Sequence, residues 1–189
     1  MRKKNLILTA LFLVISVSTA FSQGFTPPAE GKAVIYFTRV TRFAGSVSFE
    51  YFHQDKYIGI FKGSNYMRYE CDPGQQLLWA SSENKEFITS DLKAGETYIV
   101  IVNIEAGAWK ARVGLQPISA DDTVLFNRAK DLIIKKKPVV TSEAKIQQMN
   151  IKLASFIAEK LRMYETTWKK KYTIGHISAD MAIPFEYLK

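Results

Sequence analysis

The sequence predicts a mainly β, antiparallel sandwich-like domain followed by a long C-terminal amphipathic α-helix. Short apolar runs separated by turn signals recur about every 8 to 12 residues from Lys32 to Gln116, a spacing typical of a sandwich or barrel. From Ser142 the apolar residues recur at steps of three and four, without Gly or Pro before Tyr172, which is typical of a helix. We therefore divide the chain into a leader (1–22), a sandwich-like domain (23–118) and a helical extension (119–189) that docks on the sheet or extends from it.

The N-terminus has the pattern of a secretory signal peptide. Three basic residues at positions 2–4 precede an uncharged apolar run that ends with small residues at Ala20 and Ser22. This pattern predicts cleavage between Ser22 and Gln23 and export to the periplasm or the medium. An uncleaved membrane anchor is the alternative, but polar Ser and Thr side chains within the run favour cleavage. No cysteine lies directly after the run, which argues against a lipoprotein.

The charge and the cysteine count narrow the function classes. The net charge is +8 over 189 residues, and the basic residues are scattered along the chain. We therefore expect no nucleic-acid partner for this exported protein. Cys71 is the single cysteine, so no internal disulfide can form. Stability must come from burial, which a composition of 47% hydrophobic residues permits.

The first two strands are predicted from alternating apolar and polar residues. Residues 32–39 and 46–53 each place an apolar side chain at every second position, which indicates strands with one face in the core. The predicted inward residues are Ala33, Ile35, Phe37, Val47, Phe49 and Tyr51.

Two turns are predicted to form hairpins. Residues 54–56 are polar and connect the second strand to a third, in which Gly59 suggests a bulge or close approach of a neighbouring backbone. Pro73 and Gly74 suit the second and third positions of a type II turn. We expect a second hairpin there, with Cys71 as the last inward residue of its first strand.

The remaining strands and a short helix follow. Residues 97–104 are apolar on both faces, which predicts a central strand covered on both sides. Trp109, Ala111, Val113 and Leu115 alternate in the next strand, and Pro117 is expected to end it. Ser119, followed by two aspartates, is predicted to begin a short helix.

The long helix is predicted over residues 142–172, with Ser142 as its N-cap. About 30 residues would make a helix about 45 Å long, whereas a strand of about eight residues spans only about 26 Å. The helix must therefore bend, be covered by the C-terminal tail, or offer part of its apolar stripe to a partner. The candidate interaction residues are Met149, Leu153, Phe156, Leu161, Tyr164 and Trp168.

Residues that could carry catalysis are few. His53 and His176 match no metal-ligand spacing, and Cys71 is not part of a CxxC pair. A cysteine hydrolase using Cys71 and His53 is an alternative, because the two residues fall on neighbouring predicted strands. Cys71 alternates in phase with Met67 and Tyr69, which favours an inert core thiol. We expect no metal, no cofactor and no enzymatic activity.

Aromatic residues gather between positions 49 and 69. Such a cluster favours an ordinary core, but it also suggests an alternative function in carbohydrate or lipid binding. The candidate ligand-face residues are Tyr51, Tyr57 and Tyr66. The basic amphipathic helix could also lie on an anionic membrane surface, although docking on the sheet is favoured.

Three segments of the chain resemble a known family. They are "GKAVIYFTR", "QDKYIGIFKGSNYMRYECDPGQQLLWA" and "LKAGETYIVIV". In this order they are similar to the bacterial envelope family catalogued as domain of unknown function 2846, over residues 31–118. The chain departs from the family in its polar turn at 54–56, and at Gln76, where the family often has histidine. The resemblance implies an envelope protein and assigns no functional residue; the long helix lies outside it.

Together these observations predict an exported, non-enzymatic binding or structural module of the bacterial cell envelope. The expected partner is another envelope protein or a second copy of the chain, bound through the stripe of the long helix.

Overall fold

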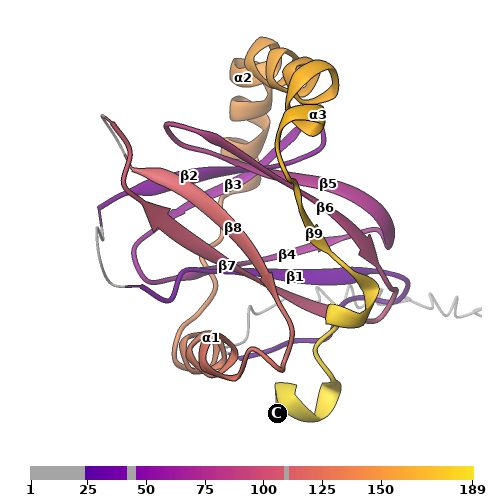
Figure 1. The fold of residues 1–189 in the computed structure, drawn as a ribbon. Coiled ribbons are helices and arrows are strands. Elements are labelled where there is room, and N and C mark those ends of the chain that lie inside the picture. Colours follow the sequence, from indigo (N-terminus) through magenta and orange to yellow (C-terminus); the bar gives the residue numbers. More distant parts are fainter. Residues whose placement is uncertain (1–23, 42–45, 109–110) are drawn as a thin grey trace, which may run out of the picture.

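The computed structural model describes residues 24–41, 46–108 and 111–189. Within them, nine strands form two sheets that pack face to face, with one long helix outside each sheet (Figure 1). The first sheet has the order β4-β1-β7-β8 and the second β3-β2-β5-β6-β9. The strands are β1 Ala33–Thr38, β2 Ser48–His53, β3 Lys56–Lys62, β4 Tyr66–Cys71, β5 Gly74–Ser81, β6 Lys85–Leu92, β7 Thr97–Glu105, β8 Arg112–Ile118 and β9 Gly175–Ile177.

The sandwich and the C-terminal helix are confirmed, but the sheets are mixed rather than purely antiparallel. β1 pairs in parallel with β7, and β6 pairs in parallel with β9. Between β1 and β7 the chain passes twice through the second sheet. These crossings supply the long connection that a parallel pair requires.

The two predicted hairpins have different outcomes. β2 and β3 pair across Gln54 and Asp55 as expected. The predicted hairpin at Pro73 and Gly74 is wrong, because β4 and β5 belong to different sheets. Gly74 does adopt the predicted positive φ, at 90°. The turn that contains it connects the two sheets instead of closing a hairpin.

The bulge expected at Gly59 is confirmed, whereas the close approach there is made by side chains rather than by a neighbouring backbone. The register between β2 and β3 shifts between Tyr51 and Phe52, which marks a bulge. A Cβ atom at Gly59 would lie 2.8 Å from Met67 Sδ and 3.0 Å from Thr141 Oγ1. A side chain at this position would require Met67 or Thr141 to shift.

The space between the sheets is filled by one apolar cluster, the inter-sheet core. Ala33, Ile35, Phe37, Phe49 and Tyr51 point into it as predicted, and Cys71 is buried there. Val113 and Leu115 also join this core, with Ala111 packed against it, whereas Trp109 lies outside the described residues. Pro117, expected to end the strand, lies within β8. β8 is an edge strand, where a missing N–H is tolerated.

Helix α1, Thr123–Lys135, packs on the outer face of the first sheet. β7 is therefore covered on both sides, as predicted: Val100 points into the inter-sheet core and Ile101 toward α1. The helix begins later than expected, with Asp122 rather than Ser119 at the N-cap, and its first turn holds no acidic residue. Before it, the Ser119 hydroxyl and the Asp122 carboxylate bond to backbone N–H groups in a turn, which delays the helix.

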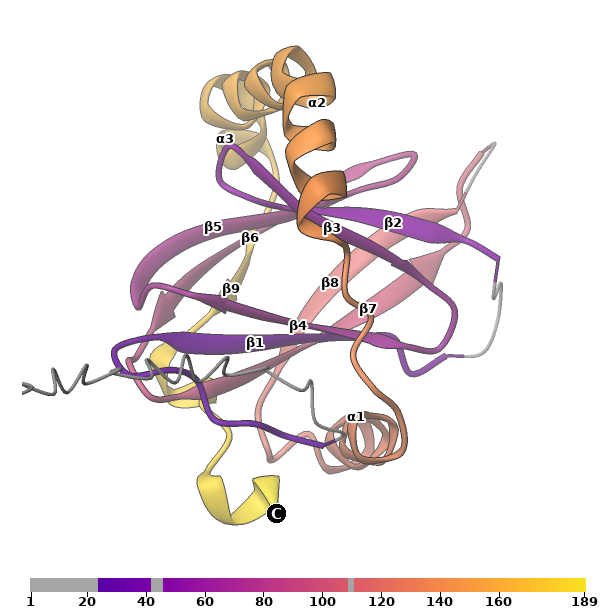
Figure 2. The same cartoon turned by 180° about the vertical axis from the view of Figure 1, so that it is seen from behind.

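Helix α2, Glu143–Met163, covers the outer face of the second sheet. Ser142 is its N-cap and accepts a hydrogen bond from Lys145 N at 3.4 Å. The helical path continues through a π-turn at Tyr164–Trp168 and the short α3, Lys169–Lys171. Figure 2 shows that the path rises from the sheet and then changes direction across it, so the overhang is resolved by bending.

The C-terminal tail ties the two layers together and does not cover α2. Its strand β9 pairs with β6, and Ile183 N then donates to Thr97 O at 2.8 Å. Ile183 is buried in the cluster beneath α1. The tail continues through the 3₁₀ turns Ala179–Met181 and Phe185–Leu188. Residues 119–189 thus contribute to both faces of the sandwich.

Candidate functional site

The three tyrosines predicted as a ligand face are buried and point into three different layers. Tyr51 stacks on Phe61 in the inter-sheet core, with ring centroids 4.9 Å apart. Tyr57 lies beneath α2, and Tyr66 lies beneath α1. Burial raises the pKa of both Tyr57 and Tyr66 to about 12. The prediction of an exposed aromatic face formed by these residues is therefore wrong.

The candidate interaction stripe of α2 is seated on the chain's own sheet. Met149 and Tyr164 are buried, and the other stripe residues, Leu153, Phe156, Leu161 and Trp168, are partly buried against the same cluster. At the centre of this cluster Phe52 stacks on Trp79 at 3.8 Å. Much of the stripe is therefore taken up by the second sheet, and binding of a partner through its remaining surface stays a prediction.

The proposed Cys71–His53 pair is not formed. Cys71 is buried in the inter-sheet core, and this burial raises the pKa of its thiol to about 11. His53 directs Nδ1 to Tyr69 Oη and Nε2 to Gln76 Oε1, each at 2.8 Å. The Gln76 amide nitrogen donates to Asp72 O, so Gln76 Oε1 accepts a hydrogen bond from His53 Nε2–H. The histidine thus links the two sheets, and both of its ring nitrogens are engaged by residues other than Cys71.

The described residues contain no group of three or more His, Cys, Asp or Glu side chains that could hold a metal ion. No helix among them is long and apolar enough to cross a membrane.

The best-formed candidate site is a cavity of about 550 Å³ where the end of the helical path meets the turn between β5 and β6. We call it the Trp168 cavity. It is lined by residues 83–87, Arg112, Lys160, Trp168 and residues 172–174. Its volume lies in the range of small-molecule sites, about 300 to 1,000 Å³.

Aromatic rings form one wall of the Trp168 cavity. Phe87 is buried and contacts Tyr164 at 4.6 Å and Trp168 at 5.6 Å between ring centroids. The π-turn places Tyr164 and Trp168 on the same side of the helical path, over Phe87, and π-turns often occur at functional sites. Tyr172 adds a ring that is 55% exposed.

Two half-buried lysines stand beside this wall. Lys85 Nζ and Lys160 Nζ lie 5.7 and 5.4 Å from the centre of the Phe156 ring. Lys85 donates to the carbonyls of Ser82 and Asn84, at 3.0 and 3.2 Å. Burial, and then the neighbouring charge of Lys160, lower the pKa of Lys85.

The opposite wall is held in place by Asn84. Its amide accepts from Val113 N and donates to Val113 O, both at 2.8 Å. The β5–β6 turn is thereby fastened to edge strand β8 in the other sheet. Glu86 follows on this wall, and burial, assisted by the charge of Glu105, raises the pKa of its carboxyl group. This part of the lining is therefore tied to β8 by hydrogen bonds within the chain.

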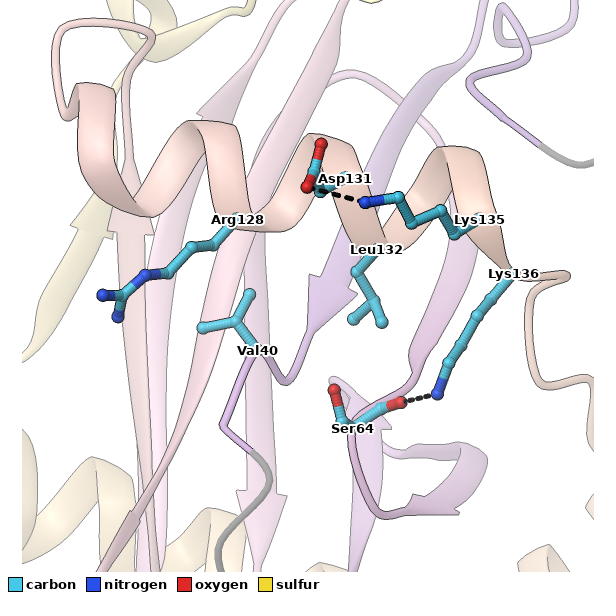
Figure 3. Close-up of a pocket in the computed structure, with 7 residues that line it drawn as sticks. All are labelled: Val40, Ser64, Arg128, Asp131, Leu132, Lys135 and Lys136. Carbon is cyan, nitrogen blue, oxygen red and sulfur yellow. Dashed lines mark hydrogen bonds and ion pairs between the residues drawn. The ribbon is translucent and has the colours of Figure 1, made fainter.

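A second cavity, of about 570 Å³, lies beside α1 and is lined by Val40, Ser64, Arg128, Asp131, Leu132, Lys135 and Lys136 (Figure 3). Its two lysines are already engaged. Lys135 pairs with Asp131 at 2.9 Å, and Lys136 donates to Ser64 O. Arg128 points away from them in Figure 3. Because these groups do not converge on a common point, we favour the Trp168 cavity.

Sequence reasoning found one residue of the Trp168 cavity and missed the rest. The helical periodicity places Trp168 in the apolar stripe and does not single out Lys85, Lys160 or Tyr172. The available signal is Tyr172, an aromatic residue four positions beyond Trp168, the last residue of the stripe. Lys85 could not be connected to them, because the contact spans the two halves of the chain.

Comparison with known proteins gives no match: no family model, no curated protein and no solved structure matches the chain. The resemblance to the envelope family therefore stays a prediction.

Proposed function

We propose that this chain is an exported, non-enzymatic binding protein of the bacterial cell envelope that holds a small polar ligand in the Trp168 cavity. The observation that carries the proposal is the convergence of Phe87, Trp168, Lys85 and Lys160 on one cavity of about 550 Å³. Apolar rings with a few fixed polar groups are the usual composition of a ligand site.

Two further observations support a binding role over catalysis. The thiol of Cys71 is buried with a raised pKa, and His53 bonds to Tyr69 and Gln76. A cysteine nucleophile needs an accessible thiolate beside its base. The leader pattern at residues 1–22 and the resemblance over residues 31–118 support export and an envelope location.

Binding can be tested by protein-observed NMR with a panel of small polar compounds. The panel contains neutral sugars, sugar acids, amino acids, nucleoside monophosphates and simple organic acids. The proposal predicts that at least one member causes saturable shifts at Phe87, Trp168 and Tyr172. Shifts confined to residues outside the cavity, or no shift with any member, would contradict it.

Export is tested separately by mass spectrometry of the protein recovered from fractionated cells. A periplasmic or extracellular protein that begins at Gln23 supports the proposal. A chain that retains its first residues in the cytoplasmic fraction contradicts this part of it, whatever the outcome of the binding assay.

A further inference from the structure

We infer that the ligand of the Trp168 cavity is a saccharide of one or two rings that carries a single carboxylate. This inference rests on the proposed function and names the chemical class of the ligand.

The first argument is the pair of lysines. Lys85 and Lys160 share the Phe156 ring, and their like charges oppose each other. Among the described carboxylates, the charge of Glu50 acts on Lys85 without forming an ion pair with it. Lys160 pairs at 2.8 Å with its exposed neighbour Glu159, while the Lys85 ammonium bonds to backbone carbonyls. An anionic group placed between the two ammoniums would relieve their repulsion and receive charge-assisted hydrogen bonds.

The second argument is the balance of charge around the cavity. Three cationic side chains, Lys85, Arg112 and Lys160, face two carboxylates, Glu83 and Glu86. Counted over the lining alone, the cations exceed the carboxylates by one, and Glu159, which lies outside the lining, pairs with Lys160. A diphosphate or triphosphate would be repelled by the two carboxylates of the lining, so a ligand with no more than one negative charge is favoured.

The third argument is the arrangement of carboxylates opposite aromatic rings. A sugar ring presents an apolar C–H face, which can pack on Trp168 or Tyr172, and hydroxyl groups at its edge. Glu86 uses one carboxylate oxygen, Oε2, to accept a bond from Asn84 Nδ2 at 3.4 Å. Ionised carboxylates only accept hydrogen bonds, so the Glu86 wall suits hydroxyl donors. The rings, the acceptors and the ammoniums together match the three faces of an acidic sugar.

The test compares two probes that differ only in the carboxylate. Cellobiouronic acid carries a carboxylate where cellobiose has a hydroxymethyl group, and adenosine monophosphate serves as a phosphate-bearing probe with a flat ring. Binding to the purified protein is measured by calorimetry, and the site is located by the NMR shifts of Trp168 and Tyr172. We expect cellobiouronic acid to bind at least about tenfold more tightly than cellobiose, as for one added charge-assisted contact.

Two variants with the same charge change provide the control. Lys160→Gln removes an ammonium from the cavity, whereas Lys170→Gln removes one from the exposed end of the helical path, outside the cavity. We expect Lys160→Gln to lower the affinity for cellobiouronic acid by about tenfold and to leave the affinity for cellobiose unchanged. Lys170→Gln should change neither affinity. Trp168→Phe, which retains an aromatic ring, should lower the affinity for both sugars.

The outcomes separate this inference from the proposed function. Equal affinity for the two sugars would overturn the inference that the ligand carries a carboxylate. Tighter binding of adenosine monophosphate would overturn the inference that the ligand is a saccharide. Either result would leave the proposal of a ligand-binding cavity intact. If the three probes leave Trp168 unshifted while another panel compound shifts it, the inference fails and the proposed function stands. If no compound shifts it, both fail.

Discussion

Replacing Asn84 with alanine should destabilise the protein by detaching the β5–β6 turn from β8. Asn84 makes two hydrogen bonds of 2.8 Å to the backbone of Val113, which is buried. Its removal leaves one N–H and one C=O of an edge strand without these partners. An unsatisfied buried group costs about 1 to 3 kcal/mol, and both hydrogen bonds are partly buried, so we expect a total loss of about 2 kcal/mol.

The assay is urea denaturation followed by circular dichroism, with a thermal melt in parallel. For a chain of this length a loss of about 2 kcal/mol corresponds to a fall in Tm of about 4 to 8 °C. Gln75→Ala, which truncates an exposed amide on β5, is the control and should change stability by less than about 0.5 kcal/mol. Asn84→Asp keeps the acceptor for Val113 N and loses the donor to Val113 O, so it should fall between the wild type and Asn84→Ala at neutral pH.

An Asn84→Ala variant as stable as the control would refute this reasoning. It would mean that water replaces the amide at no cost and that Asn84 does not fix the cavity wall. Ligand affinity then provides a second check, because a loosened wall must be ordered on binding. The variant should bind the cavity ligand more weakly than Gln75→Ala does.

The remaining predictions concern the core, one close approach and the tail. Burial raises the pKa of the Cys71 thiol to about 11, so the thiol should not react with a thiol reagent at pH 8 in the folded protein and should react once urea unfolds it. Because the pKa is higher in the folded than in the unfolded state, the contribution of this thiol to stability is fully present below the unfolded pKa and is lost as the pH rises toward 11. Reaction of the folded protein at pH 8 would contradict the burial. Gly59→Ala should cost about 1 to 3 kcal/mol, since the new Cβ would lie 2.8 Å from Met67 Sδ; an unchanged urea midpoint would show that Met67 moves aside freely. Ile183→Ala should cost about 2 to 5 kcal/mol, because this tail residue is buried beneath α1, and a loss below 0.5 kcal/mol would show that the tail is not part of the core.

The features predicted correctly from the sequence depend on neighbours in the chain. The two-sided burial of β7 follows from its unbroken apolar run, and the N-cap at Ser142 follows from local hydrogen bonding. The positive φ of Gly74 likewise follows from the Pro-Gly pair. That turn does not specify which sheet receives the next strand. The same dipeptide can close a hairpin or connect two layers, and the choice depends on distant strands.

The site residues were hard to predict for the same reason. Tyr51, Tyr57 and Tyr66 are close in sequence and aromatic, but their strands face three separate layers. Lys85 and Lys160 are 160 − 85 = 75 residues apart in the sequence, and they meet over Phe156 because α2 packs on the second sheet. Periodicity identifies the buried face of an element. It does not identify the element that covers this face.

The central claim is that the Trp168 cavity binds a small ligand, and the indole N–H resonance of Trp168 tests it most directly. Its signal is assigned by its loss in Trp168→Phe and followed while each compound of the panel is added. We predict a saturable shift with an acidic sugar, accompanied by shifts at Phe87 and Tyr172. An indole signal that stays fixed through the whole panel would contradict the account.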